Sequence, residues 1–460
     1  MLSRTPAAIL LAALVATVLP GRPALLGQDP KKEPDKEPSR EPTKLPEPKW
    51  PTEIGGKSMD AWIKDVTHPD PAIRQAALRT LPSFGPAVQK PVGKLLIARM
   101  KSTGERDPGV RLTLLSTVGT IGFDNAGEEK EALLLLGTAI DTARDGSTTR
   151  LHAVQAIAAF GPKAYSTVNY VAGTAAADSA YETRQAIANT LARIGFSETL
   201  GPNQRALVTL SGTLARDVSV AVRMEALQSL VLLGPPWAAK RPPGDKNPPV
   251  IDQVGADVVA NNMRYRLGVG PGKAVAGGKE MDRQLEIWCR VVLMRFDERE
   301  ITPQNLDEIG KHLDPDPKAE LGPKLQALQA LALFGERAAG QLDNVLKVIN
   351  DGDPLVVNTA MGCLGSMGVK AQGALNDLQK LEKKWEKLRE ERLAENLKDK
   401  KFTEFYTKLE PKEREQVVSS LQEEQTRKTV ADTVKWITAS REGKPGGDLA
   451  DPPKKEPEKK

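Results

Sequence analysis

Residues 150–164 read RLHAVQAIAAFGPKA, in which a basic residue is followed eleven residues later by a glycine. Between the two, apolar residues recur at the spacing of a helix. Five other segments keep this separation: Arg74 and Gly85, Arg111 and Gly122, Arg184 and Gly195, Arg223 and Gly234, and Lys324 and Gly335. The chain therefore contains an internal repeat, and a repeat of this length is typical of a fold built from stacked, similar units.

Each copy has the pattern of an amphipathic helix. With the basic residue as position zero, positions +3, +4, +7 and +10 are apolar in all six copies and form one buried stripe. The Gly at +11 predicts a left-handed helix cap, and Asp70-Pro71 predicts an N-cap followed by the first helical residue. A seventh copy, residues 353–368, keeps the caps and the core but has Val357 at position zero.

Partner segments with their own apolar spacing lie between the copies, at 86–100, 128–143, 162–177, 201–215, 303–313 and 338–350. From Arg74 to Arg223, successive position-zero residues are 37, 39, 34 and 39 apart, which allows one helical hairpin per period. A degenerate pair, 250–266 and 282–296, fills the longer interval after Arg223, and residues 58–66 form the first helix. We predict an all-α fold, a right-handed α-solenoid of about eight hairpins.

The repeat resembles the HEAT family, including short bacterial HEAT-like arrays, over about residues 58–370. The resemblance is carried by Asp217-Val-Ser-Val-Ala-Val-Arg223-Met-Glu-Ala226 and by the stretch from Asp178 to Arg184. It implies that the Asp and Arg are structural and link neighbouring repeats, and that the second helix of each pair lines a concave surface. The first three copies depart from the family by carrying His68, Glu105 and Arg144 at the Asp position.

Composition excludes several classes of protein. The 460 residues are 40% hydrophobic but only 4% aromatic, which favours closely packed helices over a β-rich core. A net charge of +5, from 65 basic and 60 acidic residues, does not favour nucleic-acid binding. Three His and two Cys argue against a His/Cys metal cluster, and we expect no cofactor. Cys289 and Cys363 fall in separate repeats, which predicts two free thiols.

The two ends of the chain differ in composition from the repeats. Arg4, an apolar segment at 7–19 and a break at Pro20 are typical of a secretory signal, with an uncleaved anchor as the alternative. We expect export to the periplasm or outside the cell and no membrane span after cleavage. The predicted organisation is a signal peptide at 1–27, a disordered Pro/Glu/Lys spacer at 28–51, the repeat array at 52–370 with an insertion at 235–281, charged helices at 371–442 and a disordered tail at 443–460.

The charged region at 371–442 is predicted to form two helices. The first continues to about residue 397, and the second opens at Pro411 and runs to about residue 440. They are expected to cap the open end of the solenoid, with dimerisation as the alternative.

Two candidate binding surfaces emerge. Position +5 and its neighbours are polar, unlike the apolar stripe of the same helix. Such side chains can hydrogen-bond the backbone of an extended peptide or the hydroxyls of a sugar. A solvated helix face without a ligand is the alternative. This polar column comprises Arg79, Ser116, His152, Gln155, Asn189, Arg193, Gln228 and Gln329. The insertion offers an aromatic and basic contact point made of Trp237, Lys240, Arg241 and Lys273, with a disordered insertion that makes no contact as the alternative.

No motif for catalysis is complete. Residues 54–58 end like a phosphate-binding loop but lack its first Gly, and the histidines lie in separate repeats, so no nucleophile has an evident base. The sequence therefore predicts a non-catalytic scaffold that binds another protein in the cell envelope. The alternative is an envelope structural protein that binds peptidoglycan or polysaccharide through its Lys/Glu/Pro arms.

Overall fold

The computed structural model describes residues 49–101, 104–175, 177–197, 200–234, 253–269, 280–316, 318–350 and 353–441. The chain divides into two units, Met1–Trp50 and Pro51–Lys460, and all described helices and strands belong to the second. The predicted signal peptide and tail, and nearly all of the spacer, lie outside the described residues. The same holds for all four contact residues of the insertion.

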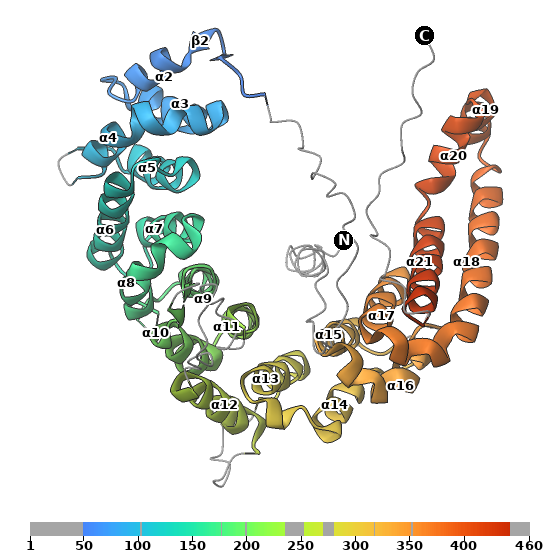
Figure 1. The fold of residues 1–460 in the computed structure, drawn as a ribbon. Helices are drawn as coiled ribbons and strands as arrows, with labels where there is room; N and C mark the ends of the chain where they lie inside the picture. The colour runs from blue at the N-terminus through green and yellow to red at the C-terminus, as the bar shows by residue number, and fades with distance from the viewer. Residues whose placement is uncertain are drawn as a thin grey trace, which may run out of the picture. The chain divides into compact units, whose positions relative to one another are not determined.

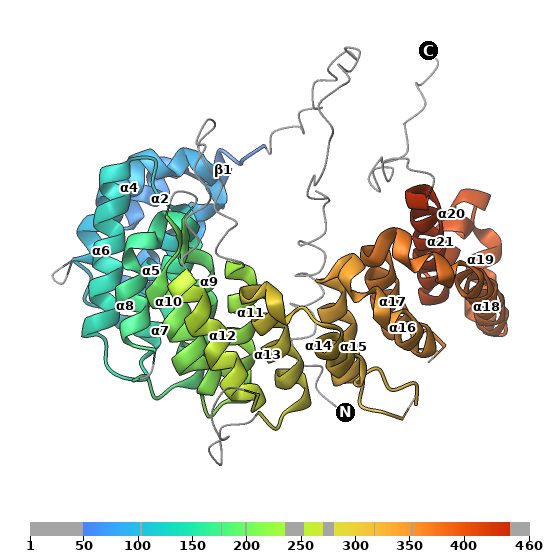
Figure 2. The ribbon, with the colours of Figure 1, turned by 60° about the horizontal axis from the view of Figure 1, so that its bottom comes forward.

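Helices in two parallel rows make up the second unit (Figure 1, Figure 2). The first row carries the repeated basic residues and comprises α3 (Pro71–Thr80), α5 (Pro108–Ile121), α7 (Thr148–Ala159), α9 (Tyr181–Ile194), α11 (Val220–Leu233), α13 (Arg283–Phe296), α15 (Leu321–Ala332) and α17 (Pro354–Met367). The second row comprises α2 (Met59–Asp65), α4 (Gln89–Met100), α6 (Ala126–Thr142), α8 (Val168–Gly173), α10 (Gln204–Val208), α12 (Gln253–Leu267), α14 (Pro303–Gly310) and α16 (Leu342–Val348).

Each second-row helix precedes its first-row partner, and each first-row helix packs against the next. The described residues thus form eight sequential hairpins, including the degenerate pair α12 and α13. The predicted all-α, HEAT-like fold class is confirmed. None of the described helices is both long enough and apolar enough to span a bilayer.

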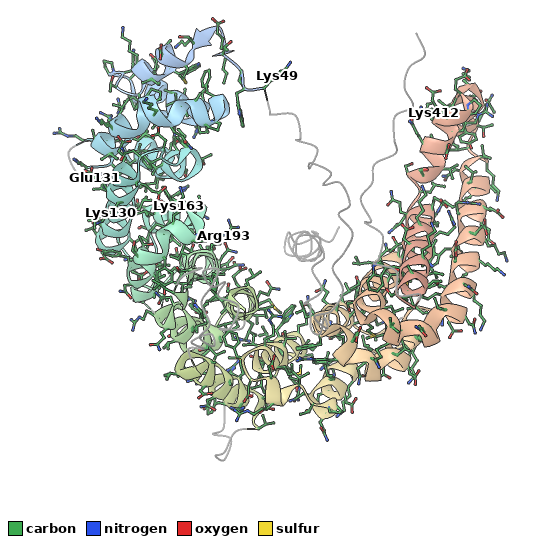
Figure 3. The ribbon with its side chains drawn as sticks, in the orientation of Figure 1. Lys49, Lys130, Glu131, Lys163, Arg193 and Lys412 are labelled. Carbon is green, nitrogen blue, oxygen red and sulfur yellow. The ribbon has the colours of Figure 1, made fainter. Side chains whose placement is uncertain are left out.

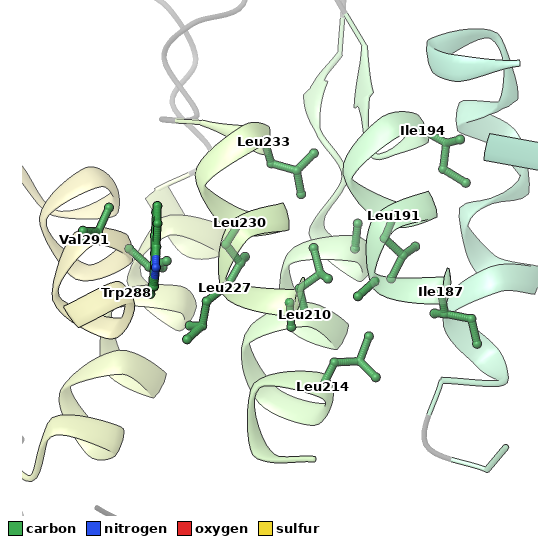
Figure 4. Close-up of a cluster of buried hydrophobic side chains, with 14 of the residues drawn as sticks. Ile187, Leu191, Ile194, Leu210, Leu214, Leu227, Leu230, Leu233, Trp288 and Val291 are labelled. Atoms are coloured by element: carbon green, nitrogen blue, oxygen red, sulfur yellow. The ribbon is translucent and has the colours of Figure 1, made fainter. Parts of the chain in front are cut away.

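The core runs between the hairpins as one continuous apolar layer. Figure 4 shows the stripes of α9 and α11 meeting side chains from neighbouring helices, with Leu191 and Leu230 fully buried. Each buried Leu or Ile contributes roughly 1.5–3 kcal/mol through the area it removes from water. The helices also approach closely, because a Cβ at Gly119 of α5 would lie 2.8 Å from Cα of Ala156 on α7.

The turns inside the repeat differ from the prediction. Gly122 has φ +68° and ψ −164°, so φ is positive as expected but ψ is extended, a region that essentially only glycine occupies. Gly195 is the exception, with φ −79°. At three of these turns the chain forms a 3₁₀ helix, so the second-row helices begin later than predicted: η1 (Leu81–Val88), η2 (Gly161–Thr167) and η7 (Gly335–Gln341). A fourth 3₁₀ helix, η8 (Gly368–Ala374), begins at the turn after the last hairpin.

The remaining short elements sit at the ends of helices. Two small antiparallel pairs join β1 (Glu53–Ile54) to β2 (Lys57–Ser58) and β3 (Phe196–Ser197) to β4 (Gly201–Pro202). The second-row helix α10 continues into the π-helical turn η3 (Thr209–Thr213) and the 3₁₀ turn η4 (Leu214–Arg216), and the 3₁₀ turn η6 (Glu298–Glu300) follows α13. These elements adjust the connections without interrupting the two rows.

Four helices follow the last hairpin: α18 (Leu375–Asn396), α19 (Lys400–Lys408), α20 (Pro411–Ser419) and α21 (Gln422–Arg441). α21 packs along α18 and against α17, and Val430 and Ile437 are fully buried there. The single helix expected from Pro411 to about residue 440 is broken near Ser420, whose hydroxyl donates to the carbonyl of Val417 and so competes with helical bonding.

Candidate functional site

Four of the repeated arginines, Arg74, Arg150, Arg184 and Arg223, bind acids of the next hairpin. Arg150 is buried, and its guanidinium donates to Asp178 Oδ2 at 2.7 Å and to the carbonyls of Ile140 and Ala143. Arg184 repeats the arrangement with Asp217, through two bonds of 2.6 and 3.0 Å. Paired donors that match a carboxylate in this way are geometrically specific. We call these bonds between hairpins the arginine ladder.

Glu105 takes the place of the family's Asp in the first link. Arg74 donates to both of its carboxylate oxygens at 2.9 Å, and Arg99 and the amide of Asp107 also donate to it. Burial by itself raises the pKa of Glu105, but the bond from Arg74 and the other donors outweigh it and lower the pKa to about 2. Glu105 thus pairs with Arg74 as Asp217 pairs with Arg184.

The ladder continues past Gly234, where the next acid is displaced in sequence. Arg223 lies 3.3 Å from Glu280 Oε2, and Arg266 of α12 binds the same carboxylate. On its other side, the Arg223 guanidinium donates to the carbonyl of Asp217 at 2.8 Å. Arg74, Arg150, Arg184 and Arg223 are thus part of the fold and not ligand-binding groups.

Part of the polar column is occupied by bonds between neighbouring helices. Asn189 donates to Glu225 Oε1 of α11 at 2.9 Å, and Arg193 donates to Asn189 Oδ1 at 3.0 Å. Figure 3 shows Arg193 on α9 of the first row, whereas Lys130 lies on α6 of the second row. A ligand that uses Asn189 would have to replace a bond already made inside the protein.

Other members of the polar column have different surroundings. Arg79 and Gln155 are exposed, whereas Gln228 and Gln329 are half-buried. The Oε1 atom of Gln329 is buried and has no hydrogen-bond partner among the described residues. Cys289 occupies the same position on α13 and is buried, so the column does not continue as a polar strip through that hairpin. Binding by this column stays a prediction.

Ser116 and His152 are brought together by the repeat, which the sequence did not indicate. Ser116 Oγ lies 2.9 Å from His152 Nδ1. Nucleophilic catalysis also needs a group that orients the imidazole and donors for an oxyanion. Within the described ranges, no carboxylate contacts His152. The pair therefore has the geometry of one more bond between α5 and α7.

The described residues contain no cluster of His, Cys, Asp or Glu suited to a metal ion. Both thiols are free and buried, as predicted, and burial raises the pKa of Cys289 and of Cys363 to about 12. A thiol with so high a pKa is neither a nucleophile nor a ready ligand at neutral pH.

A row of exposed apolar side chains at the amino ends of five first-row helices was missed by the sequence reasoning. We call it the apolar edge; it comprises Tyr181, Val218, Val220, Met281, Leu321 and Leu355. Val218 is 90% exposed and Met281 is 85% exposed. Four of the six residues stand at position −3, seven residues before the buried position +4, which in a helix is the same face; Met281 is the one of these four that precedes its helix. That spacing predicts burial, but the first turn of the helix leaves them exposed.

The sequential hairpins, joined by arginine–acid bonds, define a HEAT-like α-solenoid. No family model matches the sequence, and no curated protein matches it. Among solved structures, importin beta is 13% identical with a TM-score of 0.45, over 82% of this chain and 52% of that one.

Two further solved structures share this level of similarity. An engineered protein is 13% identical with a TM-score of 0.39, over 82% of this chain and 98% of that one. The CpcE–CpcF complex of phycocyanin lyase from Nostoc sp. PCC7120 is 14% identical with a TM-score of 0.31, over 66% of this chain and 99% of that one. Likeness at these identities concerns the fold alone.

Proposed function

We propose that the chain is a non-catalytic scaffold that binds another protein along the apolar edge. The supporting observation is the exposure of apolar side chains at position −3 of four successive repeats, from Tyr181 to Leu321, and at the neighbouring position −2 of the next, Leu355. Exposed apolar side chains that recur in the same part of successive repeats offer a surface that a partner could bury. Burying a side chain of the size of Met281 on binding would contribute roughly 1.5–3 kcal/mol.

The spacing of the edge suits an extended segment of the partner. Packed helices lie about 8–10 Å apart, and an extended polyproline-type chain presents the same face every third residue, or about every 9 Å. A partner segment with apolar residues at every third position would thus meet one edge residue per helix. The polar column on the same row of helices would supply hydrogen bonds beside it.

Charge substitutions along the edge test the proposal. Val218→Asp combined with Met281→Asp should weaken partner binding at least about tenfold, because each charge would need to be desolvated in the complex. Leu134→Asp is the matched control, since Leu134 is 55% exposed on α6 of the second row. Proteins crosslinked to each variant in cells would be quantified by mass spectrometry, with melting temperatures measured in parallel.

A partner recovered equally with the wild type and the double variant would contradict the proposal. A protein retained by Leu134→Asp and lost from the edge variant would support it. Sedimentation with purified cell wall distinguishes the polysaccharide-binding alternative, which does not depend on Val218 or Met281.

We also propose that the chain is exported, on the basis of Arg4 and the apolar segment at 7–19. The measurement is the mass of the mature protein recovered from the cell envelope. Loss of a segment ending between residues 21 and 28 is the expected result. A full-length protein confined to the cytoplasm would rule out export.

A further inference from the structure

The arginine ladder follows a simple rule of charge. The acid stands six residues before position zero of the following hairpin, as in Asp178 before Arg184 and Asp217 before Arg223. Each of these acids faces one principal guanidinium of the preceding hairpin, so one positive charge meets one negative charge. In the first link Glu105 occupies this position and accepts from Arg74, and also from Arg99 of its own hairpin.

The second link breaks the rule. Arg111 is the position-zero residue of α5, and the residue six before Arg150 is Arg144. An arginine thus stands where the partner of Arg111 should be an acid. In the part of the chain that the structure describes, neither side chain makes an ion pair or a hydrogen bond, although every other position-zero arginine makes both.

Neighbouring carboxylates do not compensate for this break. Asp145 belongs to the next link, where its Oδ1 accepts from the amide of Ser179 at 2.8 Å and lies 3.6 Å from Arg150 Nη1. Asp107 caps α5 by accepting from the amide of Val110. The two guanidinium groups of Arg111 and Arg144 are left with a net charge of two and no assigned counter-charge.

A cavity of about 300 Å³, open to solvent, lies at this position and is lined by Arg111, which is half-buried, and by Arg144, which is exposed. Thr142, Ser147 and Thr149 also line it, but the Thr142 hydroxyl already donates to the carbonyl of Thr138 at 2.8 Å. Ser147 Oγ already accepts from the amide of Arg150, so its hydroxyl hydrogen remains available for donation. The cavity therefore combines two fixed-charge donors with neutral donors and is roomy enough for more than a single water.

We propose that this cavity binds a doubly charged phosphate group, free or as a small monoester. A monovalent carboxylate would neutralise only one of the two arginines, whereas a phosphate dianion neutralises both and offers acceptors to each planar guanidinium. The ligand would complete the link between the second and third hairpins that an acid completes elsewhere. This site is separate from the apolar edge and does not rest on the proposed protein binding.

Titration of the full chain with inorganic phosphate tests the site, by calorimetry and by melting temperature. A saturable rise in melting temperature is expected, since a ligand that binds only the folded state stabilises it. Glycerol phosphate in a second series shows whether a monoester is accepted. Acetate and potassium chloride at matched ionic strength control for monovalent anions and for screening.

Two variants make the result specific to the cavity. Arg111→Gln should weaken phosphate binding by about tenfold or more. Arg144→Asp restores the acid of the ladder, so it should raise the melting temperature without phosphate and abolish the further rise with phosphate. Arg205→Gln is the control, because Arg205 is exposed on α10 and away from the cavity.

Equal responses to phosphate in the wild type and both cavity variants would overturn the proposal. The same conclusion would follow if acetate raised the melting temperature as much as phosphate does. A circular dichroism spectrum of Arg144→Asp identical to that of the wild type would confirm that a lost response reflects the site and not unfolding.

Discussion

At the scale of single residues, the ladder shows how a buried charge becomes structural. Arg184 is buried, and its guanidinium satisfies Asp217 and two backbone carbonyls of its own turn at once. Buried ion pairs stabilise little relative to apolar residues of the same volume, but removing one partner leaves the other uncompensated. The ladder therefore specifies how hairpins align more than it adds net stability.

Arg184→Met should lower the free energy of unfolding by about 2–3 kcal/mol, because the half-buried Asp217 would lose its charge partner and keep only the bond from the amide of Ser219. Arg193→Met on the same helix serves as the control. Because Arg193 is exposed, this substitution should change the free energy of unfolding by less than about 0.5 kcal/mol. Urea unfolding followed by circular dichroism measures both. Equal effects of the two substitutions would show that the bond between Arg184 and Asp217 does not contribute to stability.

Glu105 predicts a dependence of stability on pH. Its pKa falls from 4.5 to about 2 in the folded chain, so its contribution is complete above pH 4.5 and is lost as the pH falls toward 2. The shift corresponds to about 3 kcal/mol at neutral pH. Glu105→Gln should be less stable at neutral pH and should show a flatter loss of stability in this acidic window.

Urea midpoints recorded across the same pH range would measure the effect. Glu182→Gln is the control, because Glu182 is exposed on α9 and takes no part in the ladder. Parallel pH profiles for the wild type and Glu105→Gln would contradict the assignment of the low pKa to this link.

At the scale of elements, apolar periodicity located the first-row helices well, because each is long and one-sided. The starts of the second-row helices were placed too early, since Pro86 and Pro162 follow a glycine and begin 3₁₀ turns instead of α-helices. The break near Ser420 was also missed, because a local hydroxyl bond leaves no trace in the apolar pattern. Turn geometry depends on backbone angles that residue spacing does not report.

Two glycine substitutions should have opposite signs. Gly122→Ala should destabilise the chain by about 1–3 kcal/mol, because alanine is strained at φ +68° and ψ −164°. Gly362→Ala should stabilise it by about 0.5–1 kcal/mol, since it lies inside α17 with open space for a Cβ. Melting temperatures of the two variants test this, and a loss of stability at Gly362 would contradict it.

At the scale of the whole molecule, the last hairpin depends on the helices that come after it in the chain. α21 covers α17, and Trp385 and Leu378 of α18 are buried against this end. A solenoid needs a terminal element of this kind because its last repeat otherwise exposes an apolar face.

Removal of residues 375–460 should expose that face. The amides of α17 are expected to exchange hydrogen at least about tenfold faster, and the shortened chain should self-associate in light scattering. Removal of residues 443–460 alone is the matched control and should change neither the hydrogen exchange of α17 nor the self-association of the chain. Unaltered exchange in α17 after the longer deletion would show that α18–α21 do not stabilise the array.

The sequence by itself determined the fold class and the free thiols, because a short-range period of apolar residues dictates which face of each helix is buried. It also identified the repeated arginines as structural through the family resemblance. Only the tertiary structure decided that Glu105 replaces the missing Asp, that Ser116 meets His152, and that Arg111 faces Arg144 without an acid. The apolar edge likewise depends on where helices end relative to their neighbours. These features join residues more than thirty positions apart, and their contacts depend on how the hairpins stack.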